Sequence, residues 1–167
     1  MPDIIAPDLR ILFCGINPGV YSAAARHHFA GPSNRFWPTL HSAGFTPTLL
    51  RPADESALLP LRLGITNLVP RATAMAGHLS RAELQRGAQQ LAHKVLKFRP
   101  ELLAVLGLGA YRLAFGEPRA TGGLQDRSIG GTRIWLLPNP SGLNAHHSSA
   151  ELVQLFRALR RHATRFP

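Results

Sequence analysis

The chain has 167 residues and a formal net charge of +10, from 19 Lys and Arg against 9 Asp and Glu. Its one cysteine, Cys14, excludes an intrachain disulfide framework and a four-cysteine zinc or iron–sulfur site. No apolar run reaches the roughly 20 residues of a membrane span, and residues 1–7 lack the pattern of a secretion signal. We therefore expect one cytosolic domain over residues 1–167, with nucleic acid as the first candidate partner for the positive charge.

The first half of the chain predicts two strands and two short helices. Residues 9–14 (LRILFC) form an apolar run of strand length, which ends at the turn-forming residues 15–19 (GINPG). Short helices are expected over residues 34–43 and 54–59, and residues 63–69 (LGITNLV) predict a second strand.

The second half predicts three helices and two strands. Two Ser-x-x-Glu capping boxes, at residues 80–83 and 148–151, mark the starts of the two longer helices. In chain order the elements are a helix that ends before Pro100, a strand over 102–106 (LLAVL), a helix over 109–115, a strand over 133–137 (RIWLL) and a helix to about Thr164. Asp126 and Arg127 are expected in a loop.

Strands that alternate with helices favour an α/β fold with a mainly parallel sheet. In such sheets ligands bind beyond the carboxyl ends of the strands. Residues 15–19 (GINPG) and residues 139–144 (NPSGLN) both follow a predicted strand, so we expect these distant segments to meet at one site.

Each of these segments has a structural and a functional interpretation. Asn17 offers a neutral donor and acceptor beside glycines that allow close approach to a ligand, yet GINPG alone could be a plain loop. Leu143 stands in a polar loop, where it either packs beneath the loop or serves as an apolar wedge in a base stack.

A third segment, residues 29–37 (FAGPSNRFW), is rich in aromatic side chains. Phe29 could stack on a planar ligand or belong to the core, whereas Phe36 and Trp37 are expected in the core. None of the nine acidic residues falls inside GINPG or NPSGLN, so a strong general base is missing from both. The two His-His pairs lack supporting carboxylates, and no metal or cofactor is expected.

With these three segments in this order, the chain resembles the mismatch-specific uracil-DNA glycosylases, the bacterial branch of the thymine-DNA glycosylase family. The resemblance runs from Leu9 to the final helix and includes residues 64–73 (GITNLVPRAT) and 102–111 (LLAVLGLGAY). It implies a three-layer α/β/α domain with a central parallel sheet. It also implies hydrolysis of the N-glycosidic bond of uracil, or of 3,N4-ethenocytosine, opposite guanine in double-stranded DNA, without metal or cofactor.

The resemblance also implies roles for individual residues. Asn17 matches the residue that positions the attacking water, and Leu143 matches the one that fills the gap left by the flipped nucleotide. The base pocket would be lined by Gly15, Ile16, Ser22, Phe29 and Asn139, with Phe29 stacking on the base. The segment that enters the DNA and meets the widowed guanine would comprise Ser141, Gly142, Leu143 and Asn144.

Two positions depart from the family pattern. Ala145 stands where the family tends to place an arginine toward the opposite strand, and Tyr21 is bulkier than the expected neighbour of Ser22. The alternatives are a general uracil-DNA glycosylase that also accepts single strands and a non-catalytic lesion-binding protein. A monomer is expected, with Arg35, Arg71 and residues 157–165 as candidates for phosphate contacts.

Overall fold

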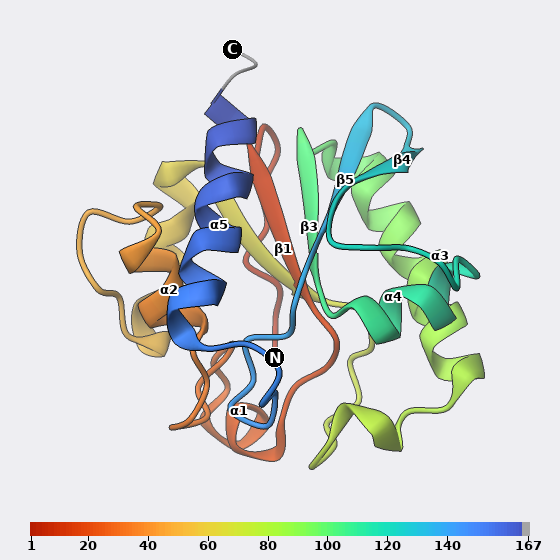
Figure 1. Cartoon of the computed structure of the whole chain (residues 1–167), viewed down its shortest axis with the longest axis horizontal. Coiled ribbons are helices and arrows are strands. Elements are labelled where there is room, and N and C mark those ends of the chain that lie inside the picture. Colours follow the sequence, from red (N-terminus) through yellow and green to blue (C-terminus); the bar gives the residue numbers. More distant parts are fainter. Residues whose placement is uncertain (165–167) are drawn as a thin grey trace.

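A five-stranded, mostly parallel sheet forms the centre of the computed structural model, which describes residues 1–164 (Figure 1). Its strands are β1 (Ile11–Gly15), β2 (Leu63–Asn67), β3 (Leu102–Leu106), β4 (Gly123–Ile129) and β5 (Thr132–Leu137), in the order β2-β1-β3-β5-β4. β1 pairs in parallel with β2 and β3, and β3 with β5, whereas β4 pairs antiparallel with β5. The mainly parallel α/β sheet predicted from the sequence is confirmed.

Helices cover both faces of the sheet and make the three layers. The helices are α1 (Val20–Ala25), α2 (Phe36–Ser42), α3 (Arg81–Phe98), α4 (Leu108–Phe115) and α5 (Ser149–Thr164), with 3₁₀ turns η1 (Pro52–Leu61) and η2 (Ala76–His78). Figure 1 shows α2 and α5 on one side of the sheet and α3 and α4 on the other. α1 lies at the edge where β1 ends (Figure 1).

Successive residues of each inner strand point to opposite faces and so build two cores. In β1, Leu12 and Cys14 pack toward α3 and α4, whereas Ile11 and Phe13 pack toward α2 and α5. All four side chains are buried, which is why this strand appears in the sequence as a continuous apolar run. Burial also raises the pKa of the Cys14 thiol to about 12, so this cysteine stays protonated.

Several elements differ from the sequence prediction, among them the unpredicted 3₁₀ turn η2 and the strand β2, which ends at Asn67 and not at Val69. Asp126 and Arg127 lie in β4, not in a loop, because this polar strand sits at the sheet edge and pairs on one side only, with β5. The short helix α1 was not predicted, because it has no side-chain cap and buries only Ser22.

The carboxyl end of the sheet gathers the loops that follow β1, β2 and β5. Main-chain hydrogen bonds join the first two of these loops, from Leu68 N to Gly15 O (2.8 Å) and from Val69 N to Ile16 O (2.9 Å). Among the helices formed by residues 1–164, none has the length and apolar character needed to cross a membrane.

Candidate functional site

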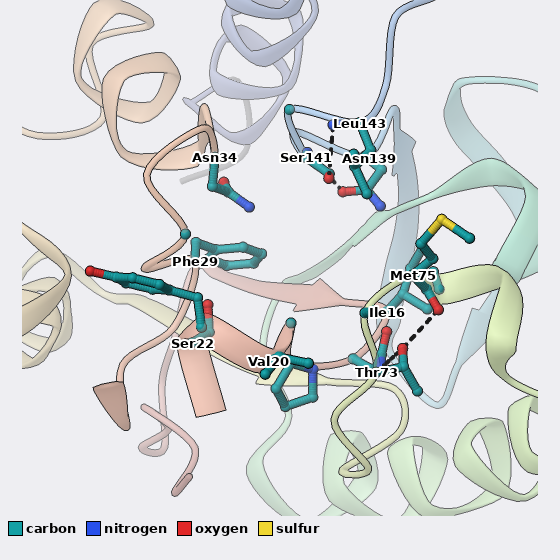
Figure 2. Close-up of a pocket in the computed structure, with 18 of the residues that line it drawn as sticks. Ile16, Val20, Ser22, Phe29, Asn34, Thr73, Met75, Asn139, Ser141 and Leu143 are labelled. Atoms are coloured by element: carbon teal, nitrogen blue, oxygen red, sulfur yellow. Dashed lines mark hydrogen bonds between the residues drawn. The ribbon is translucent and has the colours of Figure 1, made fainter. Parts of the chain in front are cut away.

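An open cavity of about 410 Å³ lies at the carboxyl end of the sheet (Figure 2). Its walls come from residues 1, 16–22, 28–29, 31–34, 67, 73–76, 139 and 141–143, so the segments after β1 and β5 meet there as predicted. The predicted site residues that line it are Ile16, Asn17, Ser22, Phe29, Asn139, Ser141, Gly142 and Leu143. Gly15 and Asn144 are not among the lining residues.

Asn17 is held by both hydrogens of its amide group. Its Nδ2 donates to the carbonyl oxygen of Arg71 (2.9 Å) and to Thr73 Oγ1 (2.7 Å). The Thr73 hydroxyl hydrogen is donated onward to Met75 O (2.8 Å), so Oγ1 can only accept from Asn17. Within residues 1–164 the Oδ1 atom of Asn17 has no hydrogen-bond partner, which makes it the free acceptor that this side chain brings to the cavity.

Phe29 presents an aromatic ring to the same cavity (Figure 2). One side of the ring packs on Phe36, with centroids 4.1 Å apart and planes tilted by 26°. Gly15 makes this placement possible, because a Cβ there would lie 3.2 Å from the ring and 2.7 Å from Asn67 Oδ1. The ring can therefore offer its other side to a planar ligand.

The turn that carries Phe29 is fixed in a strained backbone conformation. Phe29 has a φ of 53°, which is rare for a bulky side chain and costs of order 1 kcal/mol. The Oγ of Ser22 accepts a hydrogen bond from Ala30 N (2.9 Å) and anchors the turn to α1. Trp37 anchors it from the other side, since its Nε1 donates to His28 O (3.0 Å).

The loop of residues 139–144 is folded by its own polar groups. Asn139 Oδ1 accepts from Ser141 N (3.0 Å), and Ser141 Oγ accepts from Leu143 N (3.2 Å). At the tip, Leu143 is 71 % exposed, so it does not pack beneath the loop. The N–H of Asn144 already donates to Ser141 O (3.0 Å), so among the described residues 141–144 Gly142 is the one whose main-chain N–H has no partner.

Two further cavity residues, Asn67 and His28, were not identified from the sequence. His28 Nε2 lies 2.9 Å from the Pro2 carbonyl, which can only accept, so this nitrogen carries the hydrogen. Nδ1 is then the acceptor for Asn67 Nδ2 at 3.4 Å. Asn67 ends β2, whereas the predicted strand ran on to Val69. An amide side chain inside that apolar run was the signal that could have revealed Asn67.

The cavity wall carries no acidic or guanidinium side chain among the described residues that line it. His28 is buried, and this burial lowers its pKa, so the ring is neutral near pH 7. Glu55 lies behind it, accepting from His28 N (2.8 Å). Within residues 1–164 no three His, Cys, Asp or Glu side chains are grouped to hold a metal ion.

The arginines predicted to contact phosphates are mostly engaged within the protein. Arg71 pairs with Glu83 (2.6 Å), an interaction that lowers the pKa of Glu83 to about 2, and Arg157 donates to Ser42 O (3.1 Å). Arg35 donates to main-chain carbonyls of the 139–147 loop. Because α5 runs away from the cavity, its later arginines lie toward the opposite end of the sheet (Figure 1), and Arg165 lies outside the described residues.

Comparison with known proteins agrees with this architecture. A family model described as the uracil DNA glycosylase superfamily matches residues 2–160. A solution NMR structure of a Methanosarcina acetivorans protein, provisionally assigned as a uracil DNA glycosylase, is similar with a TM-score of 0.62 and 18 % sequence identity. The match covers 96 % of each chain and shows that the two proteins share a fold.

Proposed function

Because the chain belongs to the uracil DNA glycosylase superfamily, we propose that it removes uracil mispaired with guanine from double-stranded DNA. Related lesions such as 3,N4-ethenocytosine opposite guanine are proposed as further substrates. The observation that carries this proposal is a cavity that joins Asn17 and Phe29 without an acidic or guanidinium side chain in its wall, with the exposed Leu143 on its rim.

The cavity suits a planar, uncharged base that has been turned out of the duplex. An enzyme must extrude a paired base before it can reach the glycosidic bond. The free side of the Phe29 ring would stack on the base, and the amides of Asn67 and Asn139 would meet its polar edge. Asn139 Oδ1 is already used by Ser141 N, so its Nδ2 is the group available to a base carbonyl.

Leu143 suits the place that the extruded nucleotide leaves. An apolar side chain inserted between base steps keeps the stack from closing again. Extrusion costs a few kcal/mol, and least at a mismatched base. An enzyme that supplies little extrusion energy therefore prefers uracil opposite guanine.

The residues around the cavity support a dissociative hydrolysis. With no carboxylate in the wall, the glycosidic bond breaks before a nucleophile is fully formed, leaving an oxocarbenium-like sugar and a uracil anion. Main-chain N–H groups around Ile16 and Phe29 would stabilise the anion, as an oxyanion hole does. Oδ1 of Asn17 would accept a hydrogen bond from the attacking water and orient the water toward the sugar carbon. Because an amide scarcely removes a proton from water, we expect slow turnover.

The proposal is tested by base release from matched oligonucleotides. Uracil would be placed opposite guanine, opposite adenine and in a single strand, and ethenocytosine and thymine opposite guanine. We expect the fastest release from the guanine–uracil duplex. Faster release from the single strand would instead favour a general uracil-DNA glycosylase. Binding to the mismatch duplex with no release from any substrate would favour a non-catalytic lesion-binding protein.

A further inference from the structure

Arg35 ties the N-terminus of α2 to the loop that carries Leu143. Its guanidinium donates to three main-chain carbonyls of that loop, His147 O (2.7 Å), Asn144 O (2.9 Å) and Ser141 O (3.3 Å). Its main-chain N–H adds a fourth hydrogen bond, to Pro140 O (2.9 Å). Arg35 therefore donates hydrogen bonds to the carbonyls of four residues of an otherwise irregular loop.

The same loop is also held by close packing. A Cβ added to Gly142 would lie 2.5 Å from the side chain of Ser33, two residues before Arg35. The 33–35 segment and the 140–147 segment thus form one unit, although more than a hundred residues separate them in sequence. At its tip Leu143 stays exposed, so its apolar side chain is presented to the outside without support from a core.

We propose that Arg35 is a positioning residue that orders the 139–147 loop before DNA binds. The inference rests on the proposed function, in which Leu143 enters the base stack. A loop that is ordered in advance loses less conformational entropy on binding, so more of the contact energy is available to hold the duplex open. Its guanidinium is directed at loop carbonyls.

The guanidinium group is chemically suited to this role in a way that an ammonium is not. A planar fork can reach carbonyls that point at it from different turns of the loop, while a lysine presents a single point charge. Within residues 1–164 no carboxylate is within ion-pair distance of Arg35, and its Nε is buried without a partner. Among the described residues, the guanidinium of Arg35 therefore donates hydrogen bonds only to main-chain carbonyls.

The test compares Arg35→Lys with Arg112→Lys. The control makes the same chemical change at a half-buried arginine that donates to one main-chain carbonyl, that of Ala120, outside the loop. Arg35→Gln serves as a second variant if the lysine variant folds poorly. Amide hydrogen exchange would be followed over residues 141–147 and over β3. Extrusion would be followed by 2-aminopurine fluorescence beside a non-cleavable uracil analogue opposite guanine, and release by single-turnover kinetics.

We expect exchange over residues 141–147 to rise at least about tenfold in Arg35→Lys, because charge-assisted hydrogen bonds are lost, while β3 and the control stay unchanged. The extrusion signal and uracil release from duplex should fall about tenfold. Unchanged loop exchange in both Arg35 variants would overturn the inference, as would a loosened loop with normal extrusion. If the wild-type protein neither extrudes nor releases uracil, the proposed function fails, yet loop exchange still decides whether Arg35 orders the loop.

Discussion

Replacing Asn17 by alanine tests the proposed chemistry at its central atom. The change removes Oδ1, the proposed acceptor for the attacking water, and both hydrogen bonds made by Nδ2. Each such bond contributes about 1 kcal/mol net, so the free energy of unfolding should fall by about 2 kcal/mol. For a chain of this size that lowers Tm by roughly 4–8 °C.

The effect on catalysis should be much larger than the effect on stability. A group that orients the reacting water contributes about 10²–10⁴-fold to the rate, so single-turnover uracil release should fall by that factor. Thr132→Ala is the matched control, because Thr132 is buried at the far end of the sheet and donates to Pro100 O (2.6 Å). It should lose similar stability and keep its rate. Release near the wild-type rate in Asn17→Ala would refute the role assigned to Asn17.

Asn17→Asp separates orientation of the water from basicity. A carboxylate is a stronger base, but it has no hydrogen for the Arg71 carbonyl or for Thr73 Oγ1. The Arg71 carbonyl would then face a negatively charged oxygen, and the side chain should move from its present position. We expect release below the wild-type rate at pH 7, and an accelerated variant would contradict the orientation mechanism.

Three further predictions concern the cavity wall. Phe29→Leu should weaken binding of a guanine–uracil duplex about 10- to 100-fold in a titration, since base–aromatic stacking contributes about 1–3 kcal/mol. Gly142→Ala, whose Cβ would lie 2.5 Å from Ser33, should lower the free energy of unfolding by about 1–3 kcal/mol, while Gly131→Ala, with open space around it, should not. Because the pKa of His28 is below its ordinary value of 6.5 in the folded state, unfolding protonates it, so Tm should fall as pH drops below 6.5. A His28→Gln variant should lose that slope, and an unchanged pH profile would show that another group titrates.

Buried elements were predicted from the sequence more readily than exposed ones. The run LLAVL over residues 102–106 was identified because β3 is covered on both faces and needs apolar side chains throughout. The edge strand β4 escaped prediction because its sequence, GLQDRSI, satisfies a one-sided, exposed position that imposes no apolar pattern. The helix over residues 81–98 was clear from its capping box, where Ser80 Oγ accepts from Glu83 N (3.2 Å) as expected.

In the candidate site, the sequence indicated some residues, but it did not indicate contacts between separate segments. The sequence indicated Asn17 and Leu143, because short polar segments with Gly and Pro after apolar strands mark loops at the carboxyl edge of a sheet. It indicated Phe29 through the family resemblance. It could not indicate that His28 would orient the amide of Asn67, since that contact joins separate segments. It also predicted a phosphate contact for Arg35, and it gave no sign that the Arg35 guanidinium donates to a carbonyl more than a hundred residues away.

By itself, the sequence determined the alternation of strands and helices and the chemical types available at the strand ends, because these depend on neighbouring residues. Only the tertiary structure decided which side chains share the cavity and which donor meets which acceptor. A polar group gives no local sign of the partner it will find across the fold. Leu143 illustrates the difference, since its place in a polar loop was visible in the sequence, whereas its exposure is known only from the folded structure.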